Sequence, residues 1–154
     1  MYDTFIGIDP GKAGAFCVIT PGKKFIYPTP CKPDYDIWKM HMQLKEHSKS
    51  TAFCVIERAQ AMPGQGVVSM FEFGRGYGIW LALLSVNYIS YTVVHAATWT
   101  KVMLAGAPGE GKERNLAAAR RLFPRWVPKT KREEGYADAV LLAAYAERIN
   151  NGQC

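Results

Sequence analysis

Two acidic residues stand where short apolar runs end, and both runs are typical of buried strands. Asp9 closes the run that begins at Thr4 and is followed by Pro-Gly, whereas Glu57 closes the run that begins at Ala52. A carboxylate at a strand end is held rigidly at the edge of a sheet, as a divalent metal site requires of its oxygen ligands. Simpler readings remain open: Asp-Pro-Gly is a common turn sequence, and Arg58 could neutralise Glu57.

A third acidic group, Glu133, Glu134 and Asp138, lies near the start of the last expected helix. Glu134 and Asp138 are four residues apart, so on one helix they would share a face and repel each other unless a cation lies between them. Asp138 also directly precedes the apolar run Ala139–Ala144 and therefore borders a buried face. Together with the two strand-end acids, this pair predicts an oxygen-rich site for Mg²⁺ or Mn²⁺ and suggests two-metal phosphodiester hydrolysis.

The positive charge of the chain is concentrated next to this acidic group. The formal net charge is +6, and residues 96–132 alone contain nine basic and two acidic residues, a local balance of +7. A basic segment is the electrostatic footprint that nucleic-acid binding requires, although a solvated helix face has the same composition.

The elements that must position these residues follow from apolar patterning and turn signals. Strands are expected at Thr4–Asp9, Ala13–Ile19, Phe25–Tyr27, Ala52–Glu57 and Tyr91–His95. Helices are expected from a cap at Asp34 or Asp36 to about His47, and at Val67–Asn87, Thr98–Leu104, Glu110–Phe123 and Glu134–Asn150. This order favours an α/β fold with a mixed five-stranded sheet flanked by helices, and 154 residues indicate a single domain over 1–154.

Composition excludes several classes of protein. Hydrophobic residues make up 49% of the chain, which argues against disorder, and no apolar run approaches the roughly 20 residues that span a bilayer. The first residues lack the pattern of a secretion signal, so an intracellular protein is expected. The four cysteines show no CxxC spacing, which supports neither a disulfide framework nor a zinc cluster.

The ordered motifs resemble the RuvC-like Holliday-junction resolvases of the RNase H-fold nuclease superfamily, and are closer to the phage and chloroplast branches. The first motif is Gly7-Ile8-Asp9-Pro10-Gly11 with Gly14-Ala15, and the second is Val55-Ile56-Glu57. The glycine-bearing helix contains Phe73-Gly74-Arg75-Gly76-Tyr77-Gly78, and the last motif is Ala137-Asp138-Ala139. Sugar kinases and actin-like ATPases share only the first motif and need far more than 154 residues.

The resemblance implies an RNase H-like fold and a crossover junction endodeoxyribonuclease that nicks four-way DNA junctions symmetrically. Mg²⁺, or Mn²⁺ in its place, would act as two ions per site, with Asp9 bridging them and Glu57 and Asp138 each binding one. The bacterial pattern has its fourth ligand three residues before the last, where this chain has Gly135. Glu134 is assigned that role instead, and Glu133 remains a candidate.

The resemblance also implies a homodimer that binds four-way junction DNA, with no membrane and no nucleotide cofactor. The helix at Val67–Asn87 would form the dimer contact, and Met62 or Gln65 could wedge between bases. Arg75 could meet a phosphate or simply a carboxylate. The basic residues expected to grip phosphates are Lys101, Lys112, Arg114, Arg120, Arg121, Lys129, Lys131 and Arg132. The expected location is cytoplasmic or nucleoid-associated, with a phage or organellar origin open.

Alternative functions remain. The stretch Gly106–Glu113 fits the G-x-x-x-x-G-K of a phosphate-binding loop, but Glu113 stands where Ser or Thr must bind Mg²⁺, which argues against an ATPase. A catalytically silent RNase H-like module that only binds nucleic acid would keep the same fold. A nuclease acting on other branched DNA or on RNA–DNA hybrids would use the same acids, because loops rather than carboxylates set the substrate.

Overall fold

A five-stranded mixed sheet forms the centre of the protein. The computed structural model describes residues 1–49, 51–61 and 63–153. The strand order is β3-β2-β1-β4-β5, in which β1, β2 and β3 are antiparallel neighbours and β4 and β5 run parallel to β1. The strands are β1 (Thr4–Asp9), β2 (Ala15–Thr20), β3 (Lys23–Pro28), β4 (Ala52–Glu57) and β5 (Ser90–Val94).

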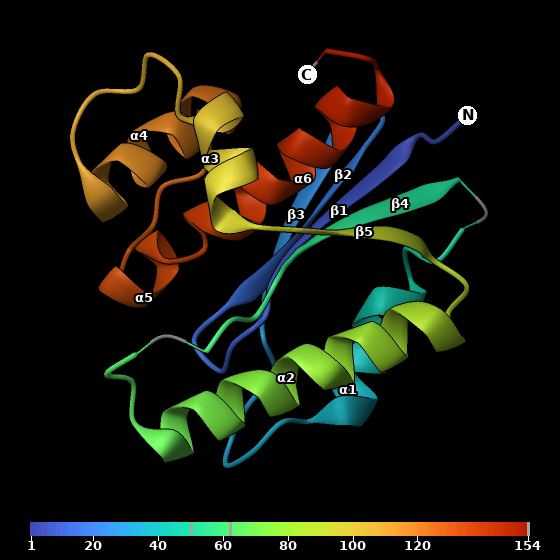
Figure 1. Ribbon diagram of the computed structural model, residues 1–154. Coiled ribbons are helices and arrows are strands. Elements are labelled where there is room, and N and C mark those ends of the chain that lie inside the picture. The colour runs from blue at the N-terminus through green and yellow to red at the C-terminus, as the bar shows by residue number, and fades with distance from the viewer. Residues whose placement is uncertain (50, 62, 154) are drawn as a thin grey trace.

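Helices cover both faces of this sheet (Figure 1). One face carries α1 (Ile37–Lys45) and α2 (Val67–Val86), and the other carries α3 (Ala96–Met103), α4 (Gly111–Leu122), α5 (Lys131–Glu134) and α6 (Ala137–Asn150). Side chains alternate along β1, so Ile6 and Ile8 join the core under α1 and α2 while Phe5 joins the core under α6. Burial on both faces explains why β1 and β4 read as continuous apolar runs.

The α/β class, the mixed five-stranded sheet and every expected strand are confirmed. Helix α1 begins after Asp36, whose carboxylate accepts a hydrogen bond of 2.9 Å from the backbone N–H of Lys39. In the part of the chain that the structure describes, no helix has the length and apolar character needed to cross a membrane. Cys17 and Cys54 are buried free thiols, and Cys154 lies outside the described residues.

The prediction of one helix over Glu134–Asn150 is wrong at its first residues. Helix α5 ends at Glu134, and α6 begins at Ala137. In between, the N–H groups of Gly135 and Tyr136 bond to carbonyls three residues back, so the chain makes tight turns there. Tyr136 is buried at 7% exposure and anchors this turn. Glu134 and Asp138 therefore do not share a face of one helix.

Helix α6 lies directly on β1 because Gly7 has no side chain. A Cβ atom at Gly7 would lie 2.1 Å from the backbone N of Ala143 and 2.4 Å from the carbonyl O of Ala139. Residues 139–143 of α6 are all fully buried. This contact sets the distance between the first turn of α6 and the end of β1, the two places where acidic residues stand.

Gly7→Ala is expected to reduce the free energy of unfolding by more than about 3 kcal/mol, because backbone rather than a flexible side chain occupies the space. Urea denaturation followed by circular dichroism measures the change. Gly66→Ala is the control: nothing lies within 4 Å of its Cβ position, its φ of −65° suits any residue, and alanine should change the free energy of unfolding by about 1 kcal/mol or less. Equal stability of the two variants would contradict this account of the α6 contact.

Candidate active site

A cleft of about 490 Å³ opens at the carboxyl end of β1. Asp9 lies in it, and the loop that follows is folded tightly against its backbone. The N–H of Gly11 donates to the carbonyl of Asp9 over 3.2 Å, and a Cβ at Gly14 would come within 2.2 Å of that same oxygen. The backbone at Asp-Pro-Gly therefore does form a turn, as its sequence predicts. This turn leaves the Asp9 carboxylate in the cleft.

Glu57 stands at the same level of the sheet, because β4 runs parallel to β1 with Ile8 opposite Ile56. Its Oε2 accepts a hydrogen bond of 2.6 Å from the indole Nε1–H of Trp99, a residue of α3 that is 1% exposed. Arg58 lies near His95 instead, with 3.5 Å between Nη1 and Nε2. Within residues 1–49, 51–61 and 63–153, no salt bridge joins Arg58 to Glu57.

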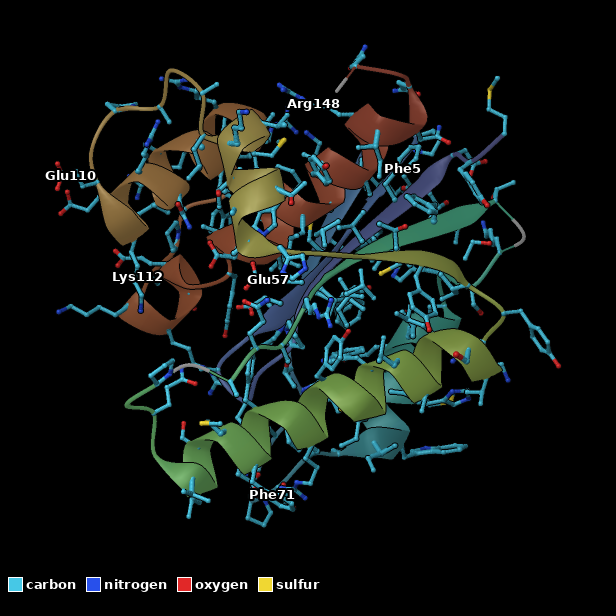
Figure 2. The ribbon with its side chains drawn as sticks, in the orientation of Figure 1. Phe5, Glu57, Phe71, Glu110, Lys112 and Arg148 are labelled. Carbon is cyan, nitrogen blue, oxygen red and sulfur yellow. The ribbon has the colours of Figure 1, made fainter. Side chains whose placement is uncertain are left out.

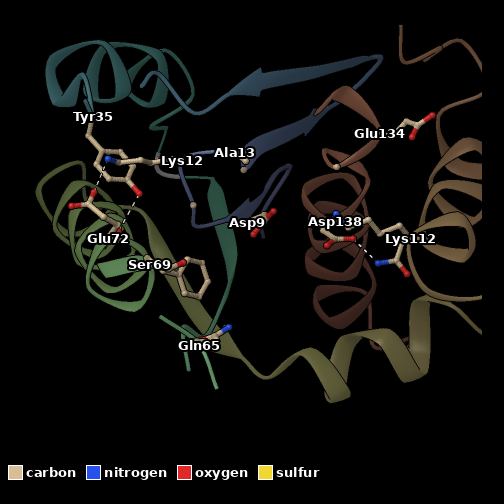
Figure 3. A pocket seen from close by; sticks show the side chains of 15 residues that line it. Asp9, Lys12, Ala13, Tyr35, Gln65, Ser69, Glu72, Lys112, Glu134 and Asp138 are labelled. Carbon is tan, nitrogen blue, oxygen red and sulfur yellow. Dashed lines mark hydrogen bonds and ion pairs between the residues drawn. The ribbon is translucent and has the colours of Figure 1, made fainter. Parts of the chain in front are cut away.

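Asp138 lies in the first turn of α6, near the positive end of the helix dipole, where a carboxylate is favoured. Its Oδ1 accepts a hydrogen bond of 2.6 Å from the side-chain amide of Asn115 in α4. Asn115 lines the same cleft as Asp9 and Asp138. Figure 3 shows the two aspartates in the middle of this cleft.

Burial raises the pKa of all three carboxylates, and repulsion between carboxylates adds to this at Asp9 and Glu57. Burial, then repulsion from Asp138 and Glu57, raises the pKa of Asp9 to about 7. The pKa of Glu57 is raised by burial, against the hydrogen bond from Trp99 and with a further contribution from Asp138. Burial also raises the pKa of Asp138, which the Asn115 bond and the charge of Lys112 oppose. The site thus brings together negative charges that only a nearby cation can compensate fully.

Glu133 and Glu134 take different positions. The Glu133 carboxylate accepts a hydrogen bond of 2.6 Å from the backbone N–H of Lys129, and its own N–H donates to the Thr130 side chain, as in a helix cap. Glu134 lines the cleft, is exposed, and turns its carboxylate away from Asp138 in Figure 3. Of the two glutamates, Glu134 is therefore the one that lines the cleft, at its rim.

The opposite wall of the cleft contains a network of charges that the sequence analysis missed. Lys12, in the loop after Asp9, forms an ion pair of 2.7 Å with Glu72 of α2. Arg75 donates two hydrogen bonds of 2.8 and 2.7 Å to the Asp34 carboxylate and also pairs with Glu72. Asp34 lies 3.5 Å from Lys12. Arg75 therefore meets carboxylates, the second of its two predicted alternatives.

The remaining predicted DNA contacts are dispersed around the cleft. Gln65 lines it, as does Lys112, whereas Met62 lies outside the described residues. Arg114 and Arg121 donate to the backbone carbonyls of Leu104 and Gly106, so they brace the connection between α3 and α4. Among the basic residues predicted to contact phosphates, the exposed ones are Lys101, Lys112, Arg120, Arg121, Lys129, Lys131 and Arg132.

The donor set fits a hard divalent cation, because it consists of carboxylate oxygens whose mutual repulsion such an ion would relieve. Among the described residues, no three His, Cys, Asp or Glu side chains already surround one point as a metal would require. The hydrogen bonds from Trp99 and Asn115 each engage one carboxylate oxygen, Oε2 of Glu57 and Oδ1 of Asp138.

Comparison with solved structures decides the fold. Over 99% of this chain and 98% of the other, the structure matches Thermus thermophilus RuvC in complex with a Holliday junction substrate, with a TM-score of 0.66 and 17% identity. A second T. thermophilus RuvC structure matches over 97% of both chains, with a TM-score of 0.63 and 19% identity. The chain has a RuvC-like fold.

Sequence comparison points in the same direction. The RuvC-like chain is 35% identical over 94 residues to the chloroplastic Holliday junction resolvase MOC1 of Chlamydomonas reinhardtii. The match covers 59% of this chain and spans 10% of the length of that relative. No protein-family model matches the chain.

Trp99→Phe is expected to weaken Mg²⁺ or Mn²⁺ binding about tenfold, because it removes the donor that orients Glu57 while keeping an aromatic ring. Isothermal titration calorimetry with the metal alone measures this. Trp80→Phe is the matched control: Trp80, a residue of α2, is equally buried, and its Nε1 has no hydrogen-bond partner among the described residues. Equal metal affinity in the two variants would remove Trp99 from the site.

Asp9→Asn is expected to stabilise the metal-free protein at high pH. The pKa of Asp9 is about 7 in the fold and 3.8 ordinarily. Its contribution to stability is therefore full below about pH 4 and is lost as the pH rises through about 7. In EDTA near pH 8, the free energy of unfolding of the variant should be about 1–3 kcal/mol higher than that of the wild-type protein. Thermal melts should show this difference decreasing to near zero toward about pH 4. A gap independent of pH would contradict the assignment.

Proposed function

We propose that this chain is a metal-dependent endonuclease that resolves four-way DNA junctions by nicking two symmetrically placed strands. The observation that carries the proposal is the convergence of three carboxylates from β1, β4 and α6 in a RuvC-like fold: Asp9 and Asp138 line one cleft, and Glu57 lies close enough to raise the pKa of Asp9. The relatives named for Holliday junction resolution support the choice of substrate. The protein would act wherever such DNA is found, in an organelle or a phage-infected cell among other places.

Asp9, Glu57 and Asp138 would hold Mg²⁺, or Mn²⁺ in its place, as two ions, with Glu134 approaching from the rim. Bound there, the ions would supply Lewis-acid polarisation of the scissile phosphate and a lowered pKa for the attacking water. Trp99 and Asn115 position two of the carboxylates through their hydrogen bonds. Lys112 lines the cleft and lowers the pKa of both aspartates, so its ammonium group lies where a phosphate would enter.

The basic segment 96–132 would hold the DNA arms beside this cleft. Lys112 is the exposed basic residue of this segment that lines the cleft, whereas the charges of the α2 wall are paired with one another. Affinity from such contacts arises largely from the release of counterions and therefore falls steeply with salt.

A homodimer formed through α2 is proposed from the exposed stripe on this helix. Val67 and Phe71 are 83% and 67% exposed, and Gly74 and Gly78 follow on the same face with nothing within 4 Å of their Cβ positions. Figure 2 shows Phe71 pointing away from the sheet. Gly76 lies on the inner face of α2, where a Cβ atom would collide with the Tyr35 hydroxyl. An apolar stripe interrupted by glycines permits close approach of a second helix.

Asp9→Asn, Glu57→Gln and Asp138→Asn are each expected to reduce cleavage at least about a thousandfold while leaving junction affinity within about threefold, because each removes a metal-binding charge but no phosphate contact. The assay uses a labelled four-way junction, a matched duplex and an RNA–DNA hybrid, each with Mg²⁺, Mn²⁺ or EDTA. Glu133→Gln, at the helix cap, is the control and should keep its cleavage activity.

Paired nicks confined to the junction and dependent on metal would support the proposal. Faster cutting of the RNA–DNA hybrid than of the junction would show that the same metal-dependent hydrolysis acts on another substrate. Tight junction binding without cleavage in either metal would favour a silent binding module.

Phe71→Lys is expected to shift the protein from dimer to monomer, because it places a charge in the centre of the proposed α2 interface. Light scattering at micromolar concentration measures the mass. Trp38→Lys, which changes a residue of α1 that is 71% exposed, is the control and should remain dimeric. A wild-type monomer that still makes paired nicks would refute the α2 dimer.

A further inference from the structure

A second pocket, of about 290 Å³, lies among the connection that follows β3, the first turns of α1 and helix α5. Positively charged and neutral polar side chains dominate its lining. Its chemically relevant residues are Thr29, Lys32, Asp36, Lys39, Gln43 and Arg132. None of them except Arg132 belongs to the cleft or to the basic segment described above.

The charge of this pocket favours an anion. Lys32, Lys39 and Arg132 are exposed and form no ion pair within the described part of the chain. Asp36 is the one acidic residue in the lining, and its carboxylate already accepts the N–H of Lys39 as the cap of α1. Three cations against one engaged carboxylate leave the pocket with a net positive charge.

Two buried oxygen atoms in the pocket lining have no hydrogen-bond partner. Thr29 is 1% exposed, and neither its Oγ1 nor the Oε1 of Gln43 is bonded within the described residues. Leaving a buried polar atom unsatisfied costs stability, so such atoms need an explanation. A threonine hydroxyl donates, and rotation of the Gln43 amide replaces its oxygen with an NH₂ donor. Both residues can therefore serve a ligand that accepts hydrogen bonds.

The pocket adjoins the active-site cleft through the loop after Asp9. The N–H of Thr29 donates to the carbonyl of Gly14 over 3.0 Å, and the Arg132 guanidinium donates to the carbonyl of Lys12 over 3.3 Å. Both Lys12 and Gly14 line the cleft. The turn between α5 and α6 also borders both pockets, because Gly135 lines the cleft and Tyr136 lines the second pocket. The two pockets are therefore neighbours.

We propose that this second pocket binds a phosphodiester group of the DNA strand whose neighbouring phosphate occupies the cleft. Lysine, arginine, hydroxyl and amide donors around one small cavity are the groups with which proteins hold phosphate oxygens. The assignment to DNA rests on the proposed function, whereas the assignment to phosphate rests on the pocket itself. The contact fixes how far the strand extends past the carboxylates.

The test compares Lys39→Gln and Thr29→Val with Lys45→Gln, an exposed residue of the same helix outside the pocket. Affinity for a labelled four-way junction and a matched duplex is measured in EDTA over a salt series. Lys39→Gln should weaken binding about three- to tenfold and reduce the slope of log affinity against log salt by about 1. Thr29→Val should weaken binding about threefold without lowering the melting temperature, because it removes an unsatisfied hydroxyl. Lys45→Gln should change neither the affinity nor the slope appreciably.

The outcomes separate this pocket from the proposed function. If the wild-type protein cuts junctions and both pocket variants bind like Lys45→Gln, the phosphate site is refuted and the resolvase stands. If junctions gain no preference over duplex but both variants weaken duplex binding, the phosphate site is supported and the resolvase fails. If inorganic phosphate raises the melting temperature of the wild type but not of the variants, while DNA affinity is the same in all, the pocket holds a free anion and the assignment to DNA is overturned.

Discussion

Three carboxylates lie close together where water is largely excluded, and within the described residues no salt bridge joins any of them to a lysine or arginine. Burial and the charges of Glu57 and Asp138 together raise the pKa of Asp9 to about 7. Such an arrangement opposes folding and persists only where the surrounding structure dictates it. The parallel pairing of β1 with β4 brings Asp9 and Glu57 to one level, and the contact of α6 with Gly7 brings Asp138 to the same place. The architecture thus confines charges that would separate in water.

Neutral donors rather than cations hold two of these acids. Trp99 and Asn115 each donate one hydrogen bond of 2.6 Å, to Glu57 and Asp138. A lysine or arginine in either place would neutralise the carboxylate and compete with a metal ion, whereas an indole or an amide orients it and leaves its charge in place. Lys112 lines the cleft and lowers the pKa of Asp9 and Asp138, but it forms no salt bridge to either within the described residues. The negative charge of the carboxylates therefore remains available to a cationic ligand.

The sequence predicted the strand-end acids because continuous apolar runs and turn residues are local signals, and a carboxylate that ends a buried run has few structural explanations. It predicted Asp138 from the adjoining apolar helix. It could not find Trp99 or Asn115, which lie 42 and 23 residues from the acids that they contact, because many residue types can donate one hydrogen bond. It also failed at Gly135, where tight turns compete with a continuous helix and helix propensity alone does not decide. The pairing of Arg75 with Asp34 and Glu72 depends on tertiary contacts of the same kind.

The ion pairs of the α2 wall mechanically connect two distant parts of the molecule. Lys12 belongs to the loop that folds against Asp9, and it is tied to Glu72 on the helix whose outer face carries Phe71 and the glycine stripe. A displacement of α2 along its axis would therefore act on the loop that folds against Asp9. The four charges that neutralise this wall thus couple the outer face of α2 to the loop beside the carboxylates.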